Sequence, residues 1–114
     1  MPRLASAARV QKAAALFHAL GDPTRLSLVQ RLSSKGPESI SGLSDGASVS
    51  RQAITKHLHV LSDAGLVLSF REGRERIWKL KPQRLNEARA ALNHIDALWD
   101  QALDRLKAHV EAAN

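Results

Sequence analysis

The chain has 114 residues, which fits one globular domain and leaves no room for a second core of similar volume. Hydrophobic residues make up 44% of the chain and charged residues 25%, a composition that suggests neither an intrinsically disordered chain nor a membrane protein. With 17 Lys and Arg against 11 Asp and Glu, the net charge is +6 and the pI about 10.5, so an acidic partner such as nucleic acid is expected.

The residue types that are missing narrow the function further. The chain has no cysteine, which excludes disulfides, thiolate metal sites and cysteine nucleophiles. No apolar run approaches the roughly 18 residues of a membrane span, and the first residues lack the apolar core of a signal peptide. We therefore expect a cytoplasmic protein with no membrane partner.

Two amphipathic helices are predicted at the start of the chain. The first covers residues 4–20, where apolar side chains recur at spacings of three and four, at Val10, Ala13, Ala14, Phe17 and Leu20. Gly21 ends it, and Asp22-Pro23 supplies an N-cap followed by proline at the first helical position. The second helix then runs from Pro23 to Ser34 and is expected to bury Leu26, Val29 and Leu32.

A helix-turn-helix is predicted over residues 41–64. Lys35-Gly36-Pro37 ends the preceding helix, and residues 38–40 form an extended connector that is too short to stand as a free strand. A short helix over residues 41–46 leads into a tight turn at residues 46–48. Ser50 is a suitable N-cap for a longer helix that continues until Gly65. Two helices joined by a tight turn are typical of this motif.

The chain from residue 66 onward predicts a β-hairpin followed by a long helix. Residues 66–81 form the hairpin, with Gly73 at its charged tip and Pro82 closing it. Residues 83–111 carry a heptad-like apolar seam at Leu85, Ala88, Leu92, Ile95, Trp99, Ala102, Leu106 and Val110. Further apolar residues lie outside the seam, at Ala91, Leu98 and Leu103, so this helix can pack on its own domain and on a partner.

The predicted fold class is therefore mainly α with a small β-hairpin. One domain over residues 1–114 forms a winged helix-turn-helix, with the hairpin at residues 66–81 as the wing and long N- and C-terminal helices.

The second helix of the helix-turn-helix has two chemically different sides. At about 100° per residue, its apolar residues Ile54, Leu58 and Leu61 share one side, and the opposite side is polar. That polar side offers an amide suited to adenine, a hydroxyl, and an ammonium group for phosphate or guanine. We expect this helix and the turn before it to contact DNA through Ser48, Ser50, Arg51, Gln52, Thr55, Lys56 and His59. The alternative is an ordinary solvated helix face.

Charge distribution favours DNA contact over simple solvation. No acidic residue lies between Arg51 and Val60, and residues 47–81 hold seven Lys or Arg against three Asp or Glu. Residues 82–114 hold four against five. The expected wing contacts to phosphates or the minor groove are Arg71, Gly73, Arg74 and Arg76. The alternative for the wing is that its arginines and glutamates merely neutralise one another.

These motifs resemble the ArsR/SmtB family of winged-helix transcriptional regulators. The resemblance covers about residues 13–82 and rests on the segments at residues 19–26 (ALGDPTRL), 39–43 (SISGL), 49–61 (VSRQAITKHLHVL), 64–67 (AGLV) and 71–74 (REGR). It implies a homodimer that binds an inverted-repeat operator and represses its own promoter. The terminal helices at residues 4–20 and 83–111 would form the dimer, through Val10, Phe17, Leu92, Ile95, Trp99 and Leu106.

The chain departs from the metal-sensing members that it resembles. Those proteins carry cysteines in the short helix before the recognition helix, where residues 41–45 here read Ser-Gly-Leu-Ser-Asp. A second family site lies on the last helix, and the candidates here are His94, Asp96, Asp104 and His109. Their order is His-x-Asp, and His94 and His109 lie farther apart than in the family. We therefore expect no metal and no cofactor, in line with residues 99–106, which resemble a non-metal-sensing branch. A metal-responsive repressor remains an alternative.

The remaining candidates give weaker expectations. We expect His18 and His57 to be packed or locally hydrogen-bonded. No residue spacing indicates a nucleophile, base and orienting group, so we do not expect an enzyme. The expected partners are double-stranded DNA, a second copy of the chain and an unidentified small-molecule effector. A protein-interaction adaptor on a winged-helix scaffold is the alternative from another functional class, because the final helix is long and rich in apolar residues.

Overall fold

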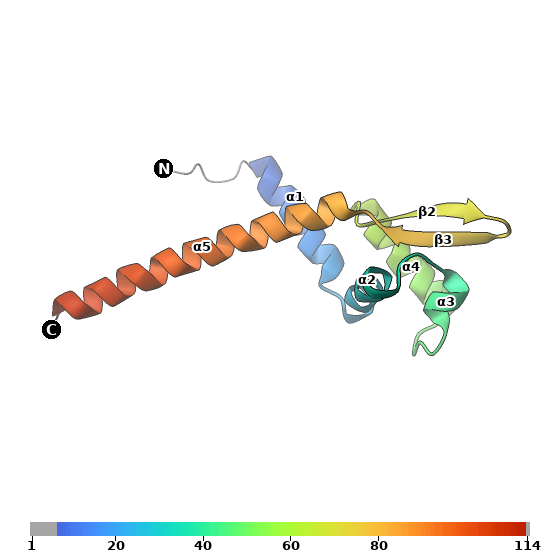
Figure 1. Cartoon of the computed structure of the whole chain (residues 1–114), viewed down its shortest axis with the longest axis horizontal. Helices are drawn as coiled ribbons and strands as arrows, with labels where there is room; N and C mark the ends of the chain where they lie inside the picture. Colours follow the sequence, from blue (N-terminus) through green and yellow to red (C-terminus); the bar gives the residue numbers. More distant parts are fainter. Residues whose placement is uncertain (1–6, 114) are drawn as a thin grey trace.

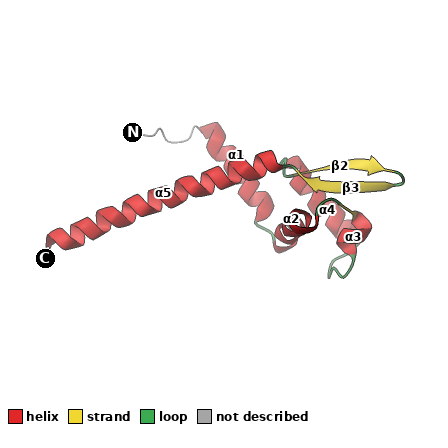
Figure 2. Cartoon of the chain, in the orientation of Figure 1, coloured by secondary structure: helices red, strands yellow, loops and turns green. Residues whose placement is uncertain are grey.

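The computed structural model describes residues 7–113 and confirms a mainly helical winged helix-turn-helix (Figure 1). In chain order the elements are α1 (Ala7–Leu20), α2 (Pro23–Lys35), β1 (Glu38–Ser39), α3 (Ile40–Ser44), α4 (Arg51–Asp63), β2 (Val67–Glu72), β3 (Glu75–Leu80) and α5 (Pro82–Ala113). Figure 2 shows the strands projecting to one side of the helical body and α5 extending to the other. Residues 4–6 of the predicted first helix lie outside the described residues.

Local capping explains where α2 begins and how it is tied to α1. The Arg25 backbone N–H donates to Asp22 Oδ2 at 3.0 Å, and Pro23 occupies the first turn, where no N–H is required. This backbone hydrogen bond is the main reason that the pKa of Asp22 is lowered. The Arg25 side chain turns back and donates to the carbonyl oxygens of Ala19 at 2.6 Å and His18 at 3.3 Å. One residue therefore joins the end of α1 to the start of α2.

The sheet has three antiparallel strands in the order β1-β3-β2. β2 and β3 form the predicted hairpin, from the pair Val67–Leu80 to the pair Glu72–Glu75 at the tip. Residues 38 and 39 of the predicted extended connector form β1, which pairs with Trp78 and Ile77 of β3, and Ile40 already belongs to α3. A strand of two residues is too short to show a period in the sequence, and it is held in place by contacts with other elements. Arg31 Nε of α2 lies 2.8 Å from Glu38 Oε2.

The hydrophobic core lies between helices α1 to α4, the sheet and the first turns of α5. Its members are Leu16, Ala19, Leu28, Val29, Leu32, Leu43, Ile54, Leu58, Leu61, Leu66, Val67, Trp78 and Ala88. The prediction for Leu26 is wrong, because 44% of this residue is exposed, and Leu28 is buried instead. The two leucines project in different directions from α2, and only packing against α4 and β3 selects the buried side.

The short helix of the helix-turn-helix differs slightly from its prediction. α3 covers Ile40–Ser44 rather than residues 41–46, because Ser39 Oγ accepts the Gly42 backbone N–H at 3.2 Å and caps it one residue earlier. The terminal boundaries of α2, α4 and α5 each agree with the predictions to within two residues.

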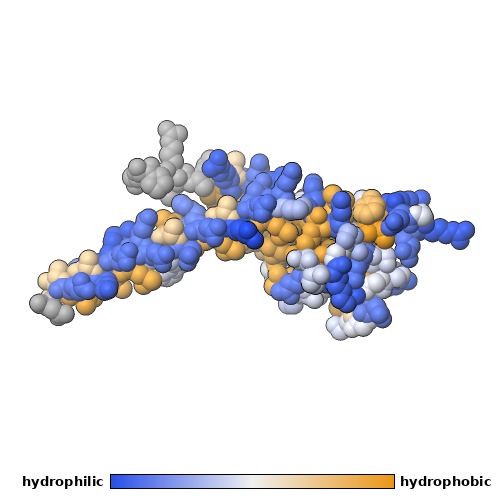
Figure 3. Space-filling model, in the orientation of Figure 1, coloured by the Kyte–Doolittle hydropathy of each residue, from blue (hydrophilic) through white to orange (hydrophobic). Residues whose placement is uncertain are grey.

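α5 is the element that differs most from the rest of the molecule. Its 32 residues correspond to about 48 Å of α-helix, within a molecule 69 Å long. Ala88 is the one α5 residue among residues 82–113 that is buried, so the expected packing on the chain's own domain is restricted to the first turns. Beyond them the helix projects alone, with apolar surface visible along it (Figure 3). Within residues 7–113, no helix has the length and apolar character needed to cross a membrane.

Candidate nucleic-acid interface

α4 is anchored through its apolar side and leaves its polar side in solvent. Ser50 Oγ accepts the Ala53 backbone N–H at 3.1 Å and fixes the start of the helix. Ile54, Leu58 and Leu61 are fully or almost fully buried. The predicted contact residues Ser48, Ser50, Arg51, Gln52, Lys56 and His59 are all exposed, and Thr55 is half-buried. The structure thus brings the predicted contact residues together at one surface.

Several of these side chains already have partners. Arg51 Nη2 donates to Ser41 Oγ of α3, which holds the guanidinium across the turn. Thr55 Oγ1 donates to the Arg51 carbonyl oxygen at 2.9 Å, so this hydroxyl proton is satisfied within α4. Among residues 7–113, the side chains of Gln52 and Lys56 make no hydrogen bond or ion pair within the chain. Their amide and ammonium groups are available to a ligand.

His59 connects α4 to the wing. Its ring lies edge-on to Trp78 of β3, with centroids 5.7 Å apart and an interplanar angle of 85°. The indole is 2% exposed, so it forms a rigid support beneath the exposed imidazole. Sequence reasoning did not find this support, because Trp78 follows His59 by nineteen residues and no local pattern links them.

The other two histidines differ from each other. His57 is hydrogen-bonded, but to a residue distant in the chain rather than locally: its Nδ1 lies 3.3 Å from Arg25 Nη1 and 3.8 Å from Asp22 Oδ2. Arg25 therefore ties both α1 and α4 to the start of α2. His18 is exposed, so its predicted packing is wrong, and the atom that accepts a hydrogen bond from Arg25 is its carbonyl oxygen.

The wing carries exposed charges that do not neutralise one another. Across the hairpin Arg71 lies opposite Arg76, and Glu72 lies opposite Glu75. Gly73 forms the turn at φ +64°, a conformation that favours glycine, and leaves Arg74 at the tip. Within the described part of the chain, the ion pairs lie outside the wing, at Arg31–Glu38, His57–Asp22 and Arg84–Glu87. The alternative of self-neutralising pairs therefore has no support here.

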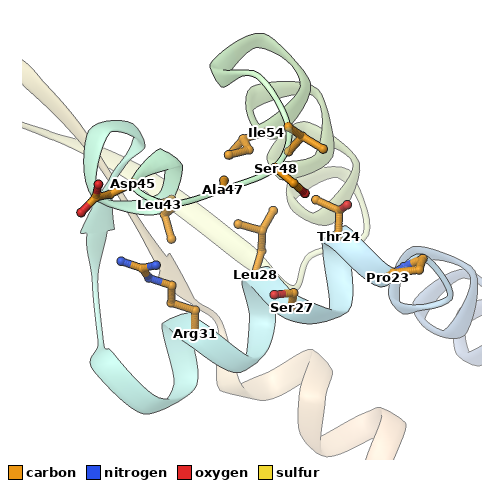
Figure 4. Close-up of a pocket in the computed structure, with 12 residues that line it drawn as sticks. Pro23, Thr24, Ser27, Leu28, Arg31, Leu43, Asp45, Ala47, Ser48 and Ile54 are labelled. Atoms are coloured by element: carbon orange, nitrogen blue, oxygen red, sulfur yellow. The ribbon is translucent and has the colours of Figure 1, made fainter.

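An open pocket of about 420 Å³ lies between α2 and the turn of the helix-turn-helix (Figure 4). Thr24, Ser27 and Arg31 line it from α2, and Asp45 and Ser48 line it from the turn. Arg31 is already engaged, because Nη2 donates to the Gly42 carbonyl oxygen at 2.9 Å and Nε pairs with Glu38. Arg31 therefore joins α2 to α3 and β1 at one side of this pocket.

The predicted dimer residues lie on an uncovered apolar surface. Val10, Leu92, Ile95, Trp99 and Leu106 are exposed, whereas Phe17 packs partly against the core. A mostly apolar groove of about 680 Å³ separates α1 from α5, lined by Val10, Ala13, Phe17, Ala91 and Ile95 among others. Trp99 is 63% exposed, which excludes a role in the core of the monomer.

The metal candidates do not converge within the chain. His94 and His109 are fifteen residues apart on one helix, which corresponds to about 22 Å. Among the residues placed by the structure, no three His, Asp or Glu side chains gather where they could hold a metal ion.

Known proteins share both the motif and the architecture. The helix-turn-helix domain family matches residues 20–69. The HTH-type transcriptional regulator Rv2034 of Mycobacterium tuberculosis is 38% identical over 87 residues, which cover 76% of this chain and 78% of that protein.

Solved structures agree with this match. An ArsR-like transcriptional regulator from Rhodococcus sp. RHA1 is 37% identical, with a TM-score of 0.74 over 88% of this chain and 93% of that one. A homodimeric winged helix-turn-helix DNA-binding domain from Mycobacterium bovis shares the fold at 19% identity, with a TM-score of 0.62 over 92% and 95% of the two chains. The chain therefore belongs to the ArsR family of winged helix-turn-helix transcriptional regulators, which are not enzymes.

Proposed function

We propose that this regulator is a homodimer that binds an inverted-repeat operator in its own promoter and represses transcription. The observation that carries the proposal is the polar side of α4, which is exposed and free of acidic residues from Arg51 to Val60. A surface of this kind beside a wing with exposed arginines suits the phosphates and base edges of DNA.

The contact residues divide by chemistry. Gln52 suits a bidentate contact with adenine, and Lys56 suits guanine or a phosphate. Arg51, Ser48 and Ser50 lie at the start of α4, where phosphates are favoured by the helix dipole. Thr55 offers its methyl group and the lone pairs of its hydroxyl, and His59 lies at the wing end of the surface. Arg71, Arg74 and Arg76 reach phosphates or the minor groove beside the helix, with Gly73 shaping the tip.

The apolar surface of α1 and α5 supports self-association. Leu92, Ile95, Trp99 and Leu106 expose a continuous seam on a helix that has no intrachain cover beyond its first turns. Val10 and Phe17 line the neighbouring groove. The M. bovis winged-helix domain of the same fold is homodimeric. A two-fold dimer calls for half-sites about 34–36 Å apart, one turn of DNA. A small apolar effector would enter the same groove and alter how α1 and α5 pack.

The test is fluorescence anisotropy of the protein on DNA from upstream of its own gene, with scrambled DNA of equal length, across a salt series. We expect binding to the native fragment to be at least about a hundredfold tighter, within the range of specific regulators. Lys56→Glu and Arg74→Glu should each weaken binding, and each lost phosphate contact should reduce the salt slope by about one. Lys107→Glu, on the projecting part of α5, makes the same charge change away from the interface and serves as the control.

The outcomes separate the alternatives. Equal and salt-sensitive binding to both fragments would leave a basic DNA-binding surface and contradict autoregulation. Unchanged affinity in both the Lys56 and Arg74 variants would contradict the assigned interface. Absence of binding to either DNA would favour the adaptor function.

A further inference from the structure

The two faces of the wing carry opposite charge. Side chains alternate between the faces of a strand, and directly paired residues share a face. The pairs Arg71–Arg76 and Ser69–Trp78 therefore lie on one face. The pair Glu72–Glu75 lies on the other face, together with Phe70 and Lys79. Each face places two like charges side by side near the tip.

The arginine face is the one directed toward the recognition helix. Trp78 is buried on this face and contacts the ring of His59 of α4. Arg71 and Arg76 continue the same face toward the tip of the hairpin. The hairpin of β2 and β3 projects away from the helices (Figure 1). Arg76 Nη1 donates to Ser69 Oγ at 2.8 Å, which keeps that guanidinium on this side of the hairpin.

The glutamate pair has no compensating charge. Within residues 7–113, neither Glu72 nor Glu75 takes part in an ion pair or a hydrogen bond of its side chain. Lys79 shares their face, but its ammonium group lies over the Phe70 ring, 5.7 Å from the centroid. Like charges directly opposite each other destabilise a hairpin, so the pair lowers the stability of the wing. A polyanion beside this face would add repulsion rather than relieve it.

We propose that the Glu72–Glu75 pair is a specificity element, which admits DNA to the wing on the Arg71–Arg76 face alone. With α4 seated in the major groove of the operator, the arginine face meets the phosphates and the glutamates point away from them. In loosely oriented complexes with other DNA, the glutamates come within the roughly 8 Å over which charges act at physiological salt. The pair therefore weakens nonspecific binding more than operator binding. This inference rests on the proposed function of DNA binding.

The test compares two variants that remove the same negative charge. Glu72→Gln with Glu75→Gln neutralises the wing pair, and Asp63→Asn with Glu111→Gln neutralises two exposed acids elsewhere. Anisotropy is measured on the operator fragment and on scrambled DNA across a salt series. For the wing variant we expect about tenfold tighter binding to scrambled DNA, a less than about threefold gain on the operator, and a steeper salt dependence on scrambled DNA. The control variant should shift both affinities by the same factor.

Each result decides between the possibilities. A specificity ratio that the wing variant leaves at the wild-type value, or changes only as the control does, would overturn the inference and leave the proposed function intact. Failure of the wild-type protein to bind either DNA would overturn both. Thermal unfolding provides a second readout, because removing like-charge repulsion should leave the midpoint of the wing variant at or above the wild-type value. A clearly lower midpoint would contradict the repulsion on which the inference rests.

Discussion

The winged core and the projecting part of α5 contain similar apolar residues, but these side chains are buried in the core and exposed on α5. In the core, Leu58, Leu61 and Leu66 are completely buried by neighbouring elements of the same chain. On α5, Leu92, Trp99 and Leu106 are more than half exposed. An exposed apolar seam of this size is typical of a binding surface. The comparison supports the proposal that the outer part of α5 packs against a second copy of the chain.

The same comparison separates the two parts of the proposed function, DNA contact and self-association. DNA contact is assigned to α4 and the wing, which are held rigidly by the core through capping, Arg25 and the contact between His59 and Trp78. Self-association is assigned to α1 and α5. Arg25 is the link between the two parts, because it bonds the end of α1 and also the His57 ring on α4.

The largest expected effect is the loss of a core side chain. Leu58→Ala should lower the free energy of unfolding by about 2–5 kcal/mol, because the leucine is 0% exposed and its removal leaves a cavity. Urea unfolding at low protein concentration measures the change. Leu106→Ala, at a position 60% exposed, is the matched control and should change monomer stability by less than about 0.5 kcal/mol. An equal loss of unfolding free energy in both variants would contradict the conclusion that Leu58 is buried in the core and Leu106 is not.

The second effect concerns the seam itself. Trp99→Ala should weaken the dimer by about 2 kcal/mol or more, about thirtyfold in Kd, because large aromatic side chains dominate the energy of interfaces. Sedimentation equilibrium measures this change. Asp100→Ala removes the adjacent exposed side chain outside the seam and should leave the dimer Kd nearly unchanged. An unchanged Kd in the Trp99 variant would show that this part of α5 does not take part in self-association.

A smaller effect is expected at the N-cap of α4. Ser50→Ala should lower the free energy of unfolding by about 1 kcal/mol, because the Ala53 N–H at the start of α4 loses its acceptor. Ser50→Asn retains a capping oxygen and should restore most of the loss. Thermal unfolding distinguishes them, and equal midpoints for the alanine variant and the wild type would contradict the capping role. This loss of stability arises from a hydrogen bond within one chain, so its size should not depend on protein concentration.

The smallest effect is a pH dependence at the junction of α1 and α2. The Arg25 backbone N–H holds the pKa of Asp22 below its unfolded value, so the folded state favours the ionised carboxylate. This contribution to stability is present above the unfolded pKa of about 3.9 and is lost as the pH falls through the folded pKa. Asp22→Asn keeps a capping oxygen without the charge. The stability difference between wild type and variant should therefore shrink on acidification from pH 6 to pH 2, as followed by urea unfolding. A difference that stays constant with pH would contradict this assignment.

Much of the architecture follows from local signals in the sequence. The structure places helix boundaries at Asp22-Pro23, Ser50 and Gly65. The Asp22 and Ser50 side chains accept backbone N–H groups at helix starts, and Gly65 adopts a positive φ just after a helix end. The change from helical periodicity to a short alternating run predicts the wing in the same way. The polar side of α4 was predictable because its apolar side has a strict helical spacing.

Local sequence signals do not predict the burial of a residue when that burial depends on packing against another element. Periodicity shows which side chains share a face, but it cannot show whether Leu26 or Leu28 meets the rest of the core. Nor could it identify Ser41 as the partner of Arg51 or Trp78 as the support of His59, since these contacts join separate elements. The predicted dimer residues illustrate the same point, because a seam can pack on its own domain or on a second copy.

Composition, caps and periodic spacing, which are properties of neighbouring residues, thus predicted the winged helix-turn-helix and the basic character of residues 47–81, and particular sequence segments carried the family resemblance. The tertiary structure decided that β1 joins the sheet, that like charges face each other across the wing, and that α5 leaves its seam uncovered. Strand register and burial depend on partners distant in the chain. Their free energy is set when the elements pack together, and no local stretch of sequence carries it.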